Sequence, residues 1–338
     1  MRRIARYSLF ALAGACVWPA GIVAQNVAAP AAAPAPQAAL QEWDVEWGGR
    51  SRDPYVAPDG KVWFVGQAGN YIAYFDPASE NMRQYEIEEG TNPHNLIVDT
   101  EGQVWYAGNR NGRIGRLDPA TGEAKIFMTG EAGDPHTLIF DGKGNIWFTS
   151  QQSNRIGRLN MASGKVDLIT PFETPSRPYG IVQDDKGNLW VALLNTNYVI
   201  RVNPESMETK LFAEASETSR ARRIEWTPDN KVWYVDERNG QLGRIDPVTG
   251  DVKHWEMPGG QGSRPYALTK DNRNILWISE TGPVKQLVAF DPESEEFISV
   301  NAVSHNIRHM MFDARTGAMW FGTDANKIGR VLTGSVQP

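Results

Sequence analysis

Seven polar side chains recur at one position of a repeated sequence unit, and their types are suited to ligand binding or proton transfer. Each stands eleven residues before a tryptophan that itself recurs along the chain. The seven residues are Arg52, His94, His136, Tyr179, Arg222, Tyr266 and His309. A purely structural repeat position should keep one residue type, so we expect these side chains to form one basic and aromatic ring that binds an anionic or carbonyl-rich ligand. The alternative is that they only hydrogen-bond to adjacent loops.

Acidic residues near this position add two further possibilities. Asp134 precedes His136 by two residues, which would place a carboxylate and an imidazole on one lip for metal binding or acid-base chemistry. Glu280 follows a repeated tryptophan by three residues, beside Arg264 of the same repeat. Such carboxylates either neutralise arginines or take part in catalysis. The sequence contains no Ser-His-Asp pattern, glycine-rich phosphate loop or Cys/His zinc spacing.

The recurring tryptophans indicate which structural elements position the ring. They are Trp63, Trp105, Trp147, Trp190, Trp233, Trp277 and Trp320, at spacings of 42, 42, 43, 43, 44 and 43 residues. Periods of this length built from short strands predict propeller blades. A large aromatic residue at one position of every blade is typical of packing between blades, although a ligand-binding box is also conceivable.

One repeat shows four strand-like runs separated by turn residues. They are residues 135–141, 145–149, 156–159 and 166–169. Gly, Asn and Asp-Pro pairs mark the connections, where positive φ or local side-chain bonding is favourable. Four antiparallel strands per repeat make one blade, so the sequence predicts an all-β propeller.

The two ends of the propeller region complement each other. The last repeat lacks a convincing fourth strand, and residues 41–47 alternate apolar with acidic residues like a fourth strand that has no blade of its own. We therefore expect the N-terminal strand to join the last blade and remove an exposed sheet edge. This arrangement gives seven blades.

The N-terminal segment predicts export. Three arginines, an apolar run and small residues are typical of a signal peptide, here residues 1–24, and residues 25–40 form an Ala/Pro-rich tether before a propeller at 41–338. We expect a periplasmic or extracellular monomer with no transmembrane segment; lipidation at Cys16, the single cysteine, is the alternative. Loss of the signal peptide leaves 31 basic against 40 acidic residues, a net charge of −9, which disfavours nucleic acid as a partner.

The repeats resemble those of the virginiamycin B lyase (streptogramin B lyase) family over residues 41–331. The resemblance is carried by the Pro-His starts at 93–94 and 135–136, the Gly-x-x-Trp runs at 102–105 and 144–147, and the Ile-Gly-Arg-Leu run at 156–159. It implies a seven-bladed propeller, Mg²⁺ as a cofactor, and opening of a cyclic depsipeptide by elimination across its ester bond.

The resemblance also implies where a catalytic site would lie. The family uses a histidine in one blade, a Glu-x-His in the next, and a glutamate three residues after the following tryptophan. These positions are here occupied by Arg222, by Arg264 and Tyr266, and by Glu280, so only the last one matches. Tyr266 could serve as the base if Arg222 and Arg264 lowered its pKa from about 10. Alternatively, the chemistry has moved to Asp134 and His136.

Two functions follow from these observations. The first is an exported carbon-oxygen lyase that acts on a cyclic ester or lactone at the channel mouth, with Tyr266, Glu280 and Arg222 in catalysis. The second is a non-catalytic envelope sensor that binds an anionic small molecule or a peptide, because arginine suits carboxylate recognition better than proton transfer. A platform for protein partners is a third possibility.

Overall fold

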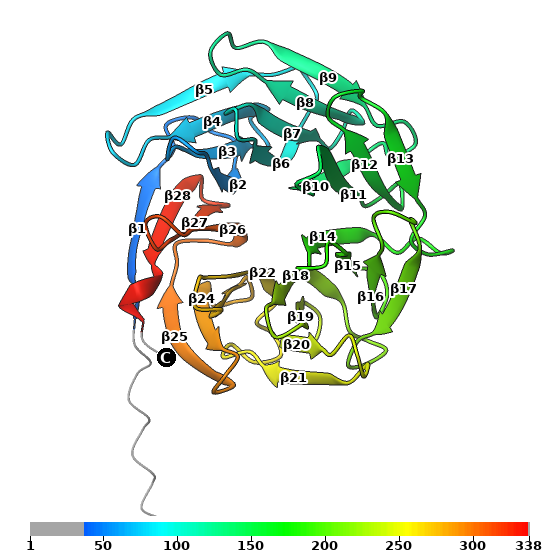
Figure 1. Ribbon diagram of the computed structural model, residues 1–338. Helices are drawn as coiled ribbons and strands as arrows, with labels where there is room; N and C mark the ends of the chain where they lie inside the picture. Colours follow the sequence, from blue (N-terminus) through cyan, green and yellow to red (C-terminus); the bar gives the residue numbers. More distant parts are fainter. Residues whose placement is uncertain (1–36, 337–338) are drawn as a thin grey trace, which may run out of the picture. The chain divides into compact units, whose positions relative to one another are not determined.

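The seven repeats fold into seven four-stranded antiparallel sheets that stand around one central axis (Figure 1). This computed structural model describes residues 37–336. The predicted signal peptide and residues 25–36 of the predicted tether lie outside the described residues. Within residues 37–336, no helix has the length and apolar character needed to cross a membrane. The seven-bladed propeller predicted from the sequence is confirmed.

Each blade has an innermost strand at the axis and a second strand that carries the repeated tryptophan (Figure 1). The innermost strands are β2 (Ser51–Val56), β6 (Pro93–Val98), β10 (Pro135–Phe140), β14 (Pro178–Gln183), β18 (Ala221–Thr227), β22 (Pro265–Lys270) and β26 (Ile307–Asp313). The second strands are β3 (Val62–Gly66), β7 (Val104–Gly108), β11 (Asn145–Ser150), β15 (Leu189–Leu193), β19 (Lys231–Asp236), β23 (Leu276–Glu280) and β27 (Ala318–Thr323).

The outer half of each blade consists of a third and a fourth strand. The third strands are β4 (Tyr71–Phe75), β8 (Arg113–Leu117), β12 (Arg155–Asn160), β16 (Tyr198–Val202), β20 (Gln241–Ile245), β24 (Gln286–Asp291) and β28 (Lys327–Leu332). The fourth strands are β5 (Met82–Glu86), β9 (Ala124–Met128), β13 (Val166–Ile169), β17 (Thr209–Ala213), β21 (Val252–Glu256), β25 (Glu296–Ala302) and β1 (Ala39–Asp44). A short 3-10 helix, η1 (Thr333–Ser335), follows β28.

The chain closes through its first strand. β1 pairs antiparallel with β28, from Ala39 opposite Leu332 to Asp44 opposite Lys327, and the two lie side by side in Figure 1. The ring of Trp43 packs against Phe75 of the first blade at 4.8 Å between centroids. The predicted closure is therefore confirmed, but the strand begins at Ala39, two residues before the predicted start, because the apolar side chain of Leu40 still packs on the core.

The repeated tryptophans fill the contacts between blades, and none is more than 3% exposed. In the blade of β10 to β13, the indole of Trp147 donates a hydrogen bond to Asp141 at 3.3 Å, and the guanidinium of Arg158 covers its ring at 5.5 Å. The neighbouring Gly157 lies under Phe148, where an added Cβ would be 2.1 Å from the ring. The packing interpretation of the tryptophans is confirmed.

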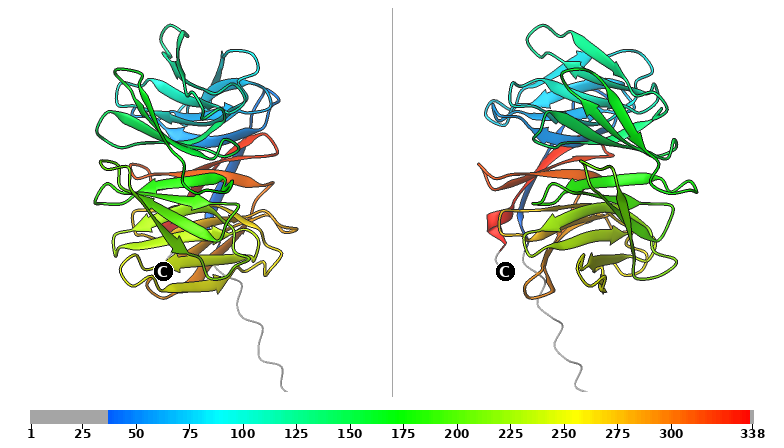
Figure 2. Two further views of the ribbon diagram at one scale, coloured as in Figure 1. Left: turned by 90° about the vertical axis from the view of Figure 1, so that its right-hand side faces the viewer. Right: turned by 45° about the vertical axis from the view of Figure 1, so that its right-hand side comes forward.

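Every innermost strand has a register shift against its second strand. In β18, for example, Ala221 pairs with Asp236 and Ile224 pairs with Tyr234, so two residues of β18 lie between these pairs against one of β19. Such a bulge breaks the strict alternation of side chains. Two consecutive residues of one innermost strand can therefore both contact side chains across the channel. Figure 2 shows the propeller from the side, with the blades arranged about the same axis.

Candidate functional site

The side chains predicted to form a ring do meet around the channel. The rings of His94 and His136 are 3.5 Å apart between centroids, those of His136 and Tyr179 are 4.3 Å apart, and those of Tyr179 and Tyr266 are 6.1 Å apart. Arg52 joins them from the first blade and is only 4% exposed. The ring thus closes the channel at the start of the innermost strands; we call the open space on that side the mouth.

The last blade contributes a different residue from the one predicted. Ile307 pairs with Thr323, and Met311 pairs with Trp320, nine residues later, whereas the corresponding separation in the other six blades is eight. The hairpin between β26 and β27 is one residue longer, so counting eleven residues back from Trp320 fails there. Arg308 therefore occupies the ring position, and its guanidinium lies 5.1 Å from the centre of the Tyr266 ring. His309, predicted for that position, lies one residue farther along the strand.

Two tyrosines form the centre of the site. The hydroxyl groups of Tyr179 and Tyr266 share a short hydrogen bond across the channel. Arg222 donates from Nη1 to the Tyr179 hydroxyl at 3.0 Å, and its guanidinium lies 4.3 Å from the centre of the Tyr266 ring. Arginine over an aromatic face interacts favourably with the π system and, more strongly, with an ionised phenol. The arrangement favours loss of one proton from the pair.

Burial and charge act in opposite directions on these phenols. Burial raises the pKa of Tyr266, but four arginines outweigh it and lower the pKa to about 7; they are Arg222, Arg52, Arg308 and Arg223. Burial, followed by the charge of Tyr266, raises the pKa of Tyr179 to about 12. One phenol of the pair is therefore an acid near neutral pH while the other keeps its proton. Arg264, which the sequence interpretation made a partner in this effect, is not among the arginines that produce it.

The rim of the mouth carries two arginine–carboxylate groups. Glu237 accepts from Arg222 Nε at 2.8 Å and pairs with Arg264 Nη2 at 3.2 Å. Arg264 is the most accessible of these cations, with a side chain 64% exposed. Asp324 accepts from Arg308 Nε at 2.8 Å. A ligand that entered the mouth would meet Arg264 first and the tyrosine pair below Arg222.

Sequence reasoning missed the hub of the site, Asp53, which is completely buried. Its carboxylate accepts from Arg52 Nε at 2.9 Å and from Asn95 at 3.2 Å, and it pairs with Arg223 Nη2 at 3.3 Å. Burial raises the pKa of Asp53, but Arg52, His309 and Arg223 together hold it well below its usual value. Asp53 and Arg223 follow ring residues directly in the chain and reach the channel because of the bulge, so an eleven-residue count passes over them.

The three histidines of the channel are neutral at pH 7. Burial, then the nearby arginines, lowers the pKa of His94 and His136 well below the ordinary value. Burial and then Arg223 lower the pKa of His309 to about 4. The Nδ1 of His136 shares its hydrogen bond with the Thr137 hydroxyl at 2.8 Å. The cationic groups of the ring and of its immediate neighbours Asp53 and Arg223 are therefore arginines and not histidines.

Two other predicted residues lie apart from the tyrosine pair. The carboxylate of Asp134 accepts from Ser150 Oγ at 2.8 Å and from the backbone of Ser153 at 2.9 Å, and so orders its own loop. Glu280 accepts from the Gly259 backbone at 3.0 Å and from Gln286, and burial raises its pKa. Neither carboxylate has a hydrogen bond or ion pair with the ring.

The residues of the mouth do not fit a divalent cation. Mg²⁺ takes carboxylate oxygens and water. The resemblance places Arg264 where the family has its metal-binding carboxylate, and the guanidinium groups of Arg264 and Arg222 repel a cation. Within residues 37–336, no three His, Cys, Asp or Glu side chains gather as a metal site. The phenol and the arginines are thus the groups available for chemistry at this mouth.

Solved structures with the same fold were compared with the chain. A streptogramin B lyase structure matches with 23% identity and a TM-score of 0.78, covering 87% of this chain and 97% of that one. A catalytically inactive virginiamycin B lyase variant from Staphylococcus aureus, crystallised with quinupristin, matches with 24% identity and a TM-score of 0.79, covering 87% and 98%.

A third match comes from a different kind of protein. The extracellular domain of a putative hybrid two component system from B. thetaiotaomicron matches with 19% identity and a TM-score of 0.70, covering 88% of this chain and 43% of that one. No curated protein matches the chain. The virginiamycin B lyase family model matches residues 41–331. Because this match spans most of the sequence, the chain belongs to the virginiamycin B lyase family.

Proposed function

We propose that this protein is an exported carbon-oxygen lyase that opens a cyclic ester or lactone-type substrate at the channel mouth, with Tyr266 as the general base. The observation that carries the proposal is the short hydrogen bond between Tyr179 and Tyr266 beneath the guanidinium of Arg222. A general base works best when its pKa lies near the working pH, and the pKa of Tyr266 is about 7. Membership of a lyase family supports the reaction class.

The proposed elimination uses only groups of this chain. The Tyr266 phenolate takes a proton from the carbon next to a carbonyl group, and the electron pair of that C–H bond forms a carbon–carbon double bond. The C–O bond on the adjacent carbon breaks, and its electrons leave with the ester oxygen as a carboxylate. Arg222 and Arg264 stabilise that carboxylate by charge-assisted hydrogen bonds, which are strongest in bidentate geometry. Tyr179 holds the phenolate in place through its hydroxyl group.

The test is to incubate the mature protein, with and without Mg²⁺, with streptogramin B and with a panel of lactones whose ring oxygen is bonded to the carbon β to a carbonyl group, as the elimination requires. Elimination forms a double bond conjugated to a carbonyl group and adds no water, so ultraviolet absorbance and product mass distinguish it from hydrolysis. We expect turnover that does not require Mg²⁺ and is lost in Tyr266→Phe. A product heavier by one water, or equal turnover in Tyr266→Phe, would contradict the proposal.

Export is part of the proposal and has its own test. The observation behind it is the arginine-led apolar run within residues 1–24. The full chain expressed in a Gram-negative host should lose that segment and be released with the periplasmic fraction. Retention of the intact N-terminus in the cytoplasmic fraction would contradict export.

One observation favours a second function, the binding of a carboxylate ligand without catalysis. Glu237 is shared by Arg222 and Arg264, so one guanidinium charge at the rim has no carboxylate of its own. Under this function, a carboxylate should raise the melting temperature of the protein, and Arg264→Ala should weaken the effect. Binding without any turnover across the lactone panel would favour this function over the lyase.

A further inference from the structure

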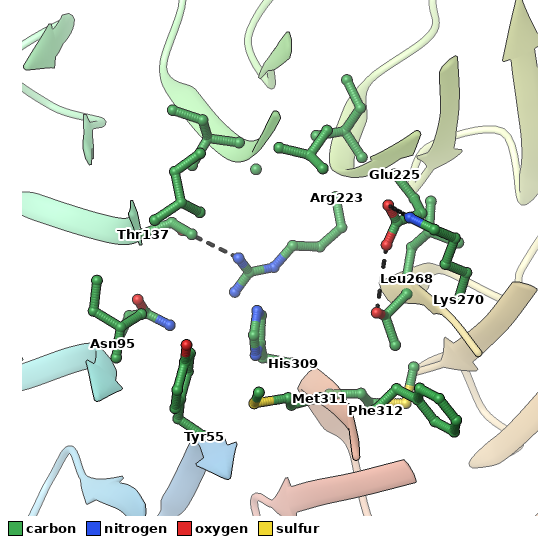
Figure 3. Close-up of a pocket in the computed structure, with 18 of the residues that line it drawn as sticks. Tyr55, Asn95, Thr137, Arg223, Glu225, Leu268, Lys270, His309, Met311 and Phe312 are labelled. Carbon is green, nitrogen blue, oxygen red and sulfur yellow. Dashed lines mark hydrogen bonds and ion pairs between the residues drawn. The ribbon is translucent and has the colours of Figure 1, made fainter. Parts of the chain in front are cut away.

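A cavity lies farther along the innermost strands than the ring and has no part in the proposed elimination. Its volume is about 570 Å³, and all seven blades contribute to its lining. This volume is within the range of roughly 300 to 1,000 Å³ that small-molecule sites occupy. Figure 3 shows the cavity with the side chains of Tyr55, Met311 and Phe312 around it. A small molecule could therefore enter the channel at the end away from the mouth.

The wall and the inner end of the cavity differ in chemistry. One side of the wall is apolar, with Ile97, Ile139, Val182 and Met311 in equivalent positions of their blades. Glu225 and Thr269 hold the same position in two other blades. The two carboxylates on the lining are neutralised in place. Glu225 pairs with Lys270 at 2.8 Å, and Asp271 pairs with Arg273 at 2.7 Å. Neither carboxylate leaves a free negative charge that would repel an anion.

Arg223 forms the inner end of the cavity and points across it in Figure 3. Its side chain is 3% exposed; Nη1 donates to Thr137 at 3.1 Å, and Nη2 pairs with Asp53 at 3.3 Å. Its Nε has no hydrogen-bond partner although it is buried, and neither has the Nδ1 of His309, which lies beside it in the same lining. Buried polar groups are almost always hydrogen-bonded. The Nε–H of Arg223 therefore lacks an acceptor, and His309 can donate to the same acceptor in the tautomer that carries its proton on Nδ1.

The charges of the channel indicate that this acceptor is an anion. Four arginines reach the axis, namely Arg52, Arg222, Arg223 and Arg308, and three carboxylates pair with them, namely Asp53, Glu237 and Asp324. Asp53 serves two of these arginines, so these side chains are one negative charge short whenever Tyr266 keeps its proton. An unpaired buried charge is costly, and a bound anion beside Arg223 would supply the missing charge.

We propose that this cavity binds an apolar monocarboxylate, with the carboxylate on Arg223 and His309 and the apolar body along the wall of Ile97, Ile139 and Val182. The site lies on the far side of the ring from Arg264 and does not depend on the proposed lyase chemistry. Its ligand also affects the mouth through charge. Arg223 and Arg52 are among the groups that lower the pKa of Tyr266, so an anion beside Arg223 raises it again.

Octanoate is the probe, and octanamide is the matched neutral control. Titration calorimetry on the full chain should show binding of octanoate at least about tenfold tighter than that of octanamide. Arg223→Gln should weaken octanoate binding by a similar factor. Val182→Trp, which fills the cavity and leaves the buried charges intact, should also abolish binding, and Arg264→Ala at the rim should leave it unchanged. Circular dichroism and melting temperature verify that each variant is folded.

A second measurement distinguishes octanoate binding in the cavity from octanoate binding at the mouth. Saturating octanoate should move the tyrosinate absorbance titration of Tyr266 to higher pH, and the shift should disappear in Val182→Trp. Octanamide that binds as tightly as octanoate would overturn the proposal. So would octanoate binding that survives in Val182→Trp and is lost in Arg264→Ala, because the anion would then occupy the mouth. Failure of the lactone assay would leave these binding results unaffected.

Discussion

The guanidinium carbon of Arg222 lies 4.3 Å from the centre of the Tyr266 ring, and Glu237 accepts a hydrogen bond from its Nε at 2.8 Å. Because Glu237 anchors Nε, Nη1 remains free to donate to Tyr179. A single arginine thus contacts both phenols and links them to the rim. The ionisation of Tyr266 therefore tests this site directly and requires no substrate.

We expect one tyrosine of the native protein to ionise at a pH near 7 rather than about 10. The physical reason is that Arg222, Arg52, Arg308 and Arg223 outweigh the burial of Tyr266. Tyrosinate absorbance followed from pH 5 to 9 should show this step, and Tyr266→Phe should remove it. Tyr234→Phe is the control, because burial raises the pKa of Tyr234 and its loss should leave the step unchanged. An identical titration in native protein and Tyr266→Phe would contradict the assignment.

Arg222→Gln should raise the pKa of Tyr266 by about one unit or more, since the arginine that lowers it most is removed. Arg264→Gln should have little effect, because Arg264 is largely exposed and lies over Glu237 rather than over the phenol. The same absorbance titration measures both variants. If the two variants shifted the titration equally, the effect would come from the general positive charge of the rim and not from the contact with Arg222.

The stability of the protein should increase with pH between about 7 and 10. Tyr266 has a lower pKa in the folded state than in the unfolded chain, so in this range the unfolded state holds more protons. One proton corresponds to about 1.4 kcal/mol of unfolding free energy per pH unit. Urea unfolding at several pH values should show a steeper rise for the native protein than for Tyr266→Phe. Parallel curves for the two proteins would contradict the lowered pKa.

Asp53→Asn should destabilise the propeller by about 3 to 5 kcal/mol, because it leaves Arg52 and Arg223 buried without their shared counter-ion. Asp44→Asn is the matched control: its ion pair with Lys327 is on the surface, and its side chain is 85% exposed. Its loss should cost less than about 1 kcal/mol. Urea unfolding compares the two variants. Equal small losses would mean that the buried arginines have another anionic partner in solution.

The fold could be predicted almost completely from the sequence, because every blade needs the same packing residue and that residue recurs along the chain. Each blade needs one tryptophan at its contact with the neighbouring blade, so the spacing of Trp63 through Trp320 gives the number and register of the blades. Closure by β1 could be predicted in the same way, because the strand-like residues 41–47 have no blade of their own and the last blade lacks a fourth strand.

The site was predicted less fully, for two physical reasons. One extra residue in the hairpin after β26 shifts the register locally, so counting from Trp320 gave His309 and missed Arg308. The bulge in each innermost strand brings a second residue to the channel, and nothing in the identity of Asp53 or Arg223 signals this. The contacts of Asp134 with its own loop also depend on backbone conformation that residue types do not specify.

The pairing of β1 with β28 also determines when the ring of blades can close during synthesis of the chain. Ala39 finds its partner Leu332 only after the residues up to 332 have been synthesised, so the first strand of the propeller to be made is the last to be paired. Contacts between such distant segments form slowly, and an unpaired strand is prone to pair wrongly. A chain that stops a few residues short, within β28, would leave both ends of the ring with open sheet edges. An intact β28 is therefore a condition for β1 to pair in the ring.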